Sequence, residues 1–148
     1  MGHPSFGYNS YFWSRLAVQE VRLMLENAVV MGFIPTRDFD RAREFYIDLL
    51  GLKLVLDDGF ALEVEANGTH IRITKVGEFT PFPFTLLGWR VSEIVAAVKE
   101  LVTKGVAFER YSFLRQDGDG IWTAPDGTKI AWFRDLEGNT LSLSQHAG

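Results

Sequence analysis

Few residues of this 148-residue chain are suited to nucleophilic chemistry. The chain has no cysteine and three histidines, of which His3 and His146 lie close to its two ends. Thiolate nucleophiles, disulfides and cysteine-ligated metal sites are therefore excluded. A serine nucleophile needs a histidine base beside it. The third histidine, His70, has no obvious partners, so we expect a surface or hydrogen-bonded residue rather than a catalytic one.

Paired carboxylates for acid–base chemistry are similarly scarce. Glu63 and Glu65 share one face of a predicted strand, where a solvated edge is the simpler interpretation. Asp119, Asp126 and Asp135 lie near glycines and are expected to form turns.

Composition places the chain among globular proteins of one domain. Hydrophobic residues make up 47% and charged residues 23%, with a formal net charge of −4 and no basic stripe. We therefore expect neither nucleic acid nor a membrane surface as a partner. No apolar run approaches the roughly 18 residues of a membrane span, and the first 27 residues lack the apolar core of a secretory signal. The expected location is cytoplasmic.

Hydrophobic spacing predicts a strand, a helix and three strands in the first half. The strand covers 28–34 and ends at Pro35, and Asp38 caps a helix that Gly51 terminates. Strands follow at 53–57, 60–66 and 69–76, separated by the turn dipeptides Asp58-Gly59 and Asn67-Gly68.

The same order is predicted again after a proline-containing linker at 77–83. A strand at 85–91 precedes a helix that Ser92 caps and Gly105 ends, and strands follow at 106–111, 128–134 and 140–145. Ala42 and Ala97 are 55 residues apart, whereas the closing glycines are 54 apart, so the second helix is one residue shorter. We infer an internal repeat, with about 15 inserted residues before Thr128.

The chain accordingly divides into an N-terminal extension, residues 1–27, and a single domain, residues 28–148. The domain consists of modules 28–78 and 84–146. The extension is either an accessory helix, a cloning artefact or translation from upstream of a natural start at Met24.

Three stretches resemble the vicinal oxygen chelate superfamily of glyoxalases, bleomycin-resistance proteins and extradiol dioxygenases. They are Ile34-Pro35-Thr36-Arg37-Asp38 with its helix to Leu50-Gly51-Leu52, Trp89-Arg90-Val91 with its helix to Gly105-Val106, and Phe133-Arg134-Asp135-Leu136-Glu137-Gly138-Asn139. The resemblance covers about 28–145. It implies an α+β fold of two tandem βαβββ modules, which form a curved, barrel-like mixed sheet around a cup with helices on the convex side.

Alternation along the strands assigns faces within that fold. Ile71, Ile73, Leu141 and Leu143 are expected to pack on the helices. The cup side then receives residues from the opening and closing strands: His70, Arg72, Thr74, Thr140, Ser142, Ser144, Met31, Phe33, Leu86, Gly88 and Arg90.

The resemblance also implies four positions at which metal-using relatives hold a divalent ion with His, Gln or Glu. Here they carry Met31, Arg72, Leu86 and Ser142. Hard divalent ions need oxygen or nitrogen ligands, and a guanidinium about 4 Å away opposes each unit of cation charge by about 4 kcal/mol at an effective dielectric constant of ~20. We expect no metal and no other cofactor.

A metal-free cup would be walled by apolar and aromatic side chains with a few polar groups, as small-molecule sites are. The candidate ligand-binding residues are Met31, Phe33, Arg72, Leu86, Arg90, Phe113, Trp122 and Ser142. Two alternatives stay open. Arg72 either holds an anionic ligand group or pairs with Glu63 or Glu65, and the segment bearing Phe113 and Trp122 either lines the pocket or covers a sheet edge.

These residues predict a metal-free protein that sequesters or carries a largely apolar ligand, with or without an anionic group. The alternative is a glyoxalase-like lyase or a dioxygenase-related enzyme, whose metal site or metal-free chemistry is not readable from the sequence. A third interpretation is an interaction domain whose cup is filled by side chains. The resemblance also implies a homodimer.

Overall fold

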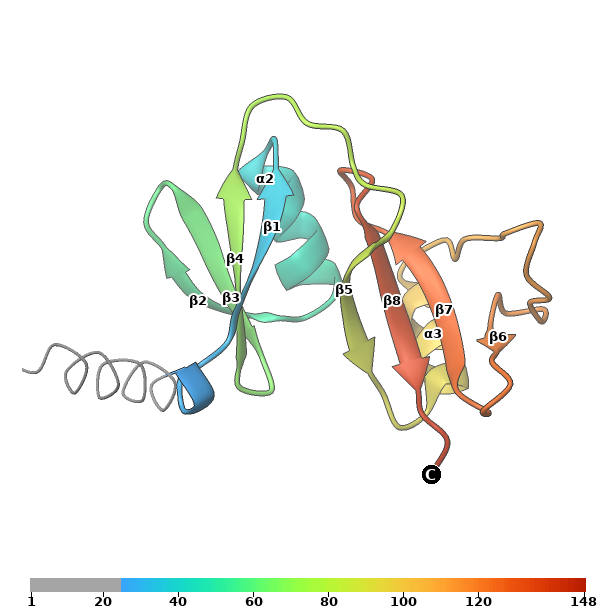
Figure 1. Ribbon diagram of the computed structural model, residues 1–148. Coiled ribbons are helices and arrows are strands. Elements are labelled where there is room, and N and C mark those ends of the chain that lie inside the picture. Colours follow the sequence, from blue (N-terminus) through green and yellow to red (C-terminus); the bar gives the residue numbers. More distant parts are fainter. Residues whose placement is uncertain (1–24) are drawn as a thin grey trace, which may run out of the picture.

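The computed structural model describes residues 25–148, so the expectations for the extension fall outside it except at its last three residues. The first module contains six elements: β1 (Met31–Thr36), α2 (Phe39–Ala42), η1 (Arg43–Leu49), β2 (Lys53–Asp57), β3 (Ala61–Ala66) and β4 (Thr69–Lys75). Its four strands form one sheet in the order β1-β4-β3-β2, in which β1 and β4 run parallel (Figure 1).

The second module repeats this arrangement. Its elements are β5 (Thr85–Arg90), α3 (Ile94–Thr103), β6 (Trp122–Thr123), β7 (Lys129–Arg134) and β8 (Thr140–Gln145). The sheet order is β5-β8-β7-β6, with β5 and β8 parallel. The α+β class and the tandem βαβββ modules are thus confirmed, as two four-stranded sheets.

One strand of the second module was predicted at the wrong place. Residues 106–111 form no strand and contribute a single bridge between Phe108 and Phe133. The Gln116 side chain accepts from the Tyr111 amide (2.8 Å) and donates to the Glu109 carbonyl (3.0 Å). The Glu109 amide donates to the Trp132 carbonyl of β7 at 2.8 Å, but no continuous ladder forms. The two-residue strand β6 takes the edge position instead.

Two element boundaries also differ from expectation. Ser92 does not cap α3. The cap position is Glu93, which makes no side-chain bond there, and the Ile94 amide donates to Oε1 of Gln145 in β8 at 2.8 Å. Strand β1 begins at Met31 and continues through Pro35, which an edge strand tolerates because one side of its backbone needs no partner.

The first helix begins as predicted, since the Asp38 side chain accepts from the Asp40 amide at 2.8 Å. From Arg43 it widens into the π-helix η1, in which the Leu50 amide reaches the Phe45 carbonyl at 2.9 Å. This widening was not predicted. Two consecutive aromatic side chains, Phe45 and Tyr46, are buried there.

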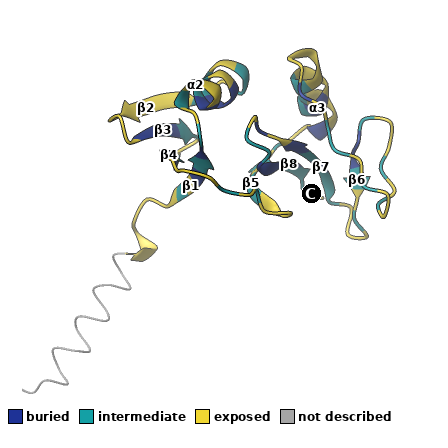
Figure 2. Cartoon of the chain, turned by 90° about the horizontal axis from the view of Figure 1, so that it is seen from above, coloured by how far each residue is buried: buried dark blue, intermediate teal, exposed yellow. Residues whose placement is uncertain are grey.

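Both helices lie on the same side of the two sheets and leave the other side, here called the inner face, without a covering layer (Figure 2). The predicted packing residues Ile71, Ile73, Leu141 and Leu143 are all buried in one core cluster with residues of both helices. Residues alternating with them belong to the inner face. Within residues 25–148, no helix has the length and apolar character needed to cross a membrane.

The two modules are joined through the turn at residues 135–139. The buried Asp135 accepts from the Tyr46 hydroxyl (2.6 Å), and the Asn139 amide group donates to the Pro35 carbonyl (3.2 Å). Burial, reinforced by the nearby Asp135 carboxylate, raises the pKa of Tyr46 far above its usual value. The Tyr46 hydroxyl therefore keeps its proton, and remains a hydrogen-bond donor, well into the alkaline range.

Replacing Tyr46 by phenylalanine removes this donor and leaves a buried carboxylate oxygen with one partner fewer. We expect Tyr46→Phe to lower the free energy of unfolding by about 1.5–3 kcal/mol, as for other hydrogen bonds to charged groups. Urea denaturation measures the loss. Tyr111→Phe is the matched control, because Tyr111 packs through its ring against Phe113 and Trp132. Equal stability of the two variants would contradict the role given to Tyr46.

Candidate functional site

The inner face of the first sheet carries a network of charged side chains. Phe33, Arg72 and Glu63 lie side by side across β1, β4 and β3. Arg72 donates through Nη2 to Oδ2 of Asp58 at 2.8 Å, and its Nη1 lies 3.9 Å from Oε2 of Glu63. Nδ1 of His70 lies 2.7 Å from Oε1 of the same glutamate. Arg72 is thus engaged by carboxylates, principally by Asp58, which sequence reasoning had assigned only to a turn.

Asp58 connects this network to the β2–β3 turn. Its Oδ1 accepts from the amides of Phe60 and Ala61, both at 2.9 Å, while its Oδ2 accepts from Arg72. The hydrogen bond from Arg72, with help from the two backbone amides, lowers the pKa of Asp58 from 3.8 to about 2. Since the carboxylate stays charged above that pH, the positive charge of Arg72 is compensated at neutral pH.

The inner face of the second sheet is aromatic instead. Trp132 lies opposite Ser142 in the β7–β8 register, and its ring centroid is 6.3 Å from that of Trp122 and 5.6 Å from that of Tyr111. Phe113 stacks at an angle on Tyr111, 5.5 Å away. The structure therefore brings Trp122, Phe113 and Ser142 to one surface. Trp132 was missed, although the strand alternation that placed Ser142 would have placed it too.

Strand β5 supplies the remaining candidate residues of this sheet. Arg90 lies opposite Ser144, and Gly88 lies opposite Ser142. A Cβ atom on Gly88 would come within 2.6 Å of the Ser142 hydroxyl oxygen. Because Gly88 has no side chain, there is room beside it for the Ser142 hydroxyl on the inner face.

A cavity of about 390 Å³ lies where the linker between the modules passes over the ends of β1 and β8. We call it the linker cavity. Its apolar walls come from Pro35, Val76, Phe79, Pro81, Phe82, Phe84 and Leu86, and its polar lining from Glu78, Thr80, Asn139 and Thr140. Leu86 is the one predicted ligand-binding residue among them.

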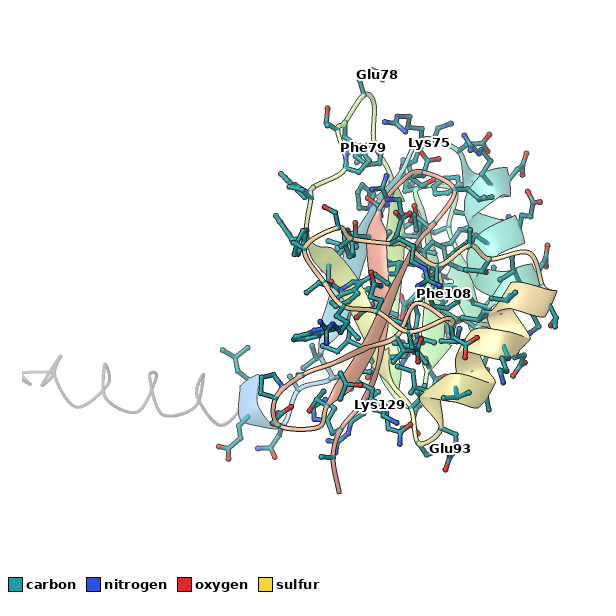
Figure 3. The ribbon with its side chains drawn as sticks, turned by 90° about the vertical axis from the view of Figure 1, so that its right-hand side faces the viewer. Lys75, Glu78, Phe79, Glu93, Phe108 and Lys129 are labelled. Carbon is teal, nitrogen blue, oxygen red and sulfur yellow. The ribbon has the colours of Figure 1, made fainter. Side chains whose placement is uncertain are left out.

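The linker wall was missed by sequence reasoning, which treated residues 77–83 only as a break in the pairing. Arg37 fastens this wall to both modules. Its guanidinium donates to Oε2 of Glu137 (2.7 Å) and to the Phe79 carbonyl (2.5 Å), and it lies 4.4 Å above the centre of the Phe79 ring. Figure 3 shows Glu78 and Phe79 at the tip of the linker, at one end of the molecule. In the sequence, the run Pro81-Phe82-Pro83-Phe84 was the feature that could have indicated an aromatic linker wall.

The four positions that would carry a divalent ion do not fit one in this structure. Arg72 is a cation that pairs with Asp58 and lies 3.9 Å from Glu63, Leu86 lines an apolar cavity, and Ser142 offers a neutral hydroxyl. Met31 contributes a thioether, which is a soft ligand. Residues 25–148 contain no group of three or more His, Asp or Glu side chains with a metal-binding arrangement.

Replacing Arg72 by methionine tests the network on the first sheet. Without the guanidinium, we expect the pKa of Asp58 to rise from about 2 toward 3.8, its value without these interactions. The wild-type ion pair is complete above pH ~4 and is lost as the pH falls through about 2, because a lowered carboxyl pKa stabilises the fold only while the group is ionised. Carboxyl chemical shifts measured by NMR follow this change. Arg43→Met, which removes the partner of the neighbouring Asp57, is the control. If the pKa of Asp58 rises by a similar amount in Arg43→Met, Arg72 is not the group that lowers it.

Comparisons with known proteins agree with this architecture. A crystal structure of a glyoxalase/bleomycin resistance protein/dioxygenase from Alicyclobacillus acidocaldarius is similar, with 21% identity, a TM-score of 0.62 and coverage of 82% of this chain and 93% of the other. A superfamily member from Sphaerobacter thermophilus DSM 20745 has 22% identity, a TM-score of 0.64 and coverage of 80% and 97%. A glyoxalase family protein from Enterococcus faecalis has 20% identity, a TM-score of 0.56 and coverage of 78% and 94%.

At these identities the solved structures establish the fold alone, and no curated protein matches the chain significantly. The family model named Glyoxalase/Bleomycin resistance protein/Dioxygenase superfamily matches residues 27–143, which include both modules. The chain therefore belongs to the glyoxalase/bleomycin resistance protein/dioxygenase superfamily.

Proposed function

We propose that this protein binds a small, largely apolar molecule without the help of a metal ion. The observation that carries the proposal is the linker cavity, because its volume of about 390 Å³ and its mostly apolar lining are typical of small-molecule sites. Its position supports the same conclusion, since Leu86 occupies a place where metal-using relatives carry a ligand.

The charges on the inner face of the first sheet favour a ligand without a strong negative charge at that position. Arg72 is already paired with Asp58 at 2.8 Å and lies close to Glu63. An anionic ligand group would have to displace these carboxylates, which requires more binding energy than occupying a free guanidinium. Of the two alternatives for Arg72, the ion pair is therefore the one we propose.

The remaining predicted residues extend the proposed binding surface along the inner face. We infer that ligands reaching beyond the linker cavity contact the charged half or the aromatic half of this face. The residues concerned are Met31, Phe33, Arg72, Arg90, Phe113, Trp122 and Ser142.

A thermal-shift screen of small apolar compounds, run with and without EDTA, tests the proposed function. A compound that binds the folded state raises Tm by mass action, by the equivalent of about 2.7 kcal/mol at 100 times Kd, and we expect EDTA to leave this shift unchanged. Leu86→Gln places an amide in the apolar lining and is expected to weaken binding at least tenfold. Leu136→Gln, at an exposed leucine outside the linker cavity, is the control.

Two results would contradict the proposal. If no compound in a broad screen raises Tm, the protein is not a small-molecule carrier. If protein purified without chelators retains about one divalent ion per chain and loses its ligand-induced shift in EDTA, binding depends on a metal.

We also propose that the protein is a homodimer. The inner face exposes large apolar side chains that a monomer would leave in water, including Phe33, whose exposure is 63%. Light scattering should give about twice the chain mass, and Phe33→Glu should lower it toward that of one chain, because a carboxylate would be buried at the interface. A monomeric mass for the wild type at micromolar concentration would refute this.

A further inference from the structure

We propose that the linker cavity takes a flat, uncharged aromatic molecule that carries a hydroxyl or N–H group. Its ring would pack on Phe82 and Phe84, and its polar group would bond to Thr140 at the cavity floor. This inference rests on the proposed function, because it specifies the class of ligand and the contacts of the same cavity.

The aromatic preference comes from the linker wall. The rings of Phe82 and Phe84 are stacked, with centroids 5.1 Å apart and planes 11° from parallel. Both line the cavity while remaining largely exposed to solvent. Two exposed parallel rings offer flat apolar surface that a planar ligand covers better than a flexible chain does, since ring stacking adds to simple burial of area.

The polar preference comes from the cavity floor. Thr140 and Asn139 line the cavity and are only 6% and 3% exposed. Both hydrogen bonds of the Asn139 side chain, to Pro35 and Asp135, are made by Nδ2, so its Oδ1 remains available as an acceptor. Among the described residues, neither this oxygen nor the Thr140 hydroxyl has a hydrogen-bond partner.

These two groups are nevertheless reached from the cavity. Every fully buried side-chain nitrogen or oxygen in the described part of the chain has a partner. The unpartnered Thr140 hydroxyl must therefore retain access to solvent, and the cavity that Thr140 lines provides it. The Thr140 hydroxyl can donate or accept a hydrogen bond, and the Asn139 amide oxygen can accept one. The cavity floor therefore suits a ligand that carries a hydrogen-bond donor.

The charge around the cavity excludes anions from the proposed ligand class. Among residues 25–148, the one ionisable residue in its lining is Glu78, whose side chain is almost fully exposed. The nearby guanidinium of Arg37 is engaged by Glu137 and by the carbonyl and ring of Phe79. Among the described lining residues, a carboxylate or phosphate on the ligand would find no free cation, because the charge of Arg37 is already compensated by Glu137 and Glu78.

The wall is also held in place before any ligand arrives. Pro81 and Pro83 each have a fixed φ and restrict the residue before them, so the run that carries the two phenylalanines has few backbone conformations. Arg37 ties the preceding Phe79 to the first module. Binding therefore loses less conformational freedom than it would with a flexible linker.

Three naphthalene derivatives test the ligand class by isothermal titration calorimetry. 2-Naphthol carries a donor hydrogen, 2-methoxynaphthalene has the same ring without that hydrogen, and 2-naphthoate is the anion. We expect 2-naphthol to bind at least threefold more tightly than the methyl ether and at least tenfold more tightly than the naphthoate. 1-Octanol, which has the hydroxyl on a flexible chain, should bind more weakly than 2-naphthol.

Variants locate the contacts. Thr140→Val keeps the shape of the floor but removes the hydroxyl, so it should abolish the preference for 2-naphthol over its methyl ether while leaving the affinity for the ether within twofold. The double variant Phe82→Ala/Phe84→Ala should weaken binding of both compounds at least tenfold. Phe60→Ala removes an exposed ring outside the cavity and should leave both affinities unchanged. The Tm of each variant without ligand reports whether it folds.

The outcomes separate this inference from the proposed function. If other compounds raise Tm but 2-naphthol does not bind, the inference is wrong and the carrier function stands. The same conclusion follows if Thr140→Val and the double variant both bind 2-naphthol as tightly as the wild type does. If 2-naphthoate binds more tightly than 2-naphthol, the charge argument is wrong. If neither the naphthalenes nor any compound of the broad screen binds, both fail.

Discussion

One buried carboxylate organises the junction on which the candidate site depends. Asp135 accepts four hydrogen bonds, from the Tyr46 hydroxyl, the backbone amides of Glu137 and Asn139, and the Asn139 side chain, at 2.6–2.9 Å. A buried carboxylate is tolerated only when its oxygens are satisfied in this way. The turn that it shapes presents Glu137 to Arg37, and Arg37 holds the linker at Phe79. The position of the cavity wall therefore follows from the geometry of this turn.

The two halves of the inner face share a backbone plan but differ in chemistry. The first carries compensated charges, with Asp58 and Glu63 close to Arg72, and the second carries the aromatic group around Trp132. The sheet order is the same in both modules, and helix-facing residues of both sheets are buried in one core. The inner-face residues do not support the core, so they are free to differ between modules. Function in this fold resides in that variable layer.

The repeated element order, the sheet faces and the Asp38 cap were predictable because alternation, helical spacing and turn dipeptides are local signals. The strand wrongly predicted at residues 106–111 shows that such local signals do not report contacts with other segments. Its apolar pattern suits a strand, but Gln116, distant by several residues, satisfies its backbone through a side chain. Likewise, no local feature indicates that Asp58 is the main partner of Arg72. The run Pro81-Phe82-Pro83-Phe84 shows that the linker is aromatic, but it does not show which residues the linker packs against. Those contacts arise only when segments far apart in the chain come together.

The π-helix η1 gives a physical account of the one-residue difference between the helices. Ala42 and Ala97 correspond, yet Gly51 lies one residue further from Ala42 than Gly105 lies from Ala97. The hydrogen bond from the Leu50 amide to the Phe45 carbonyl, five residues earlier, widens the end of η1 and holds the additional residue. Because a wider turn absorbs it, the preceding and following side chains keep their orientation toward the core. The first module thus holds one residue more than the second inside a helix that remains packed on the core.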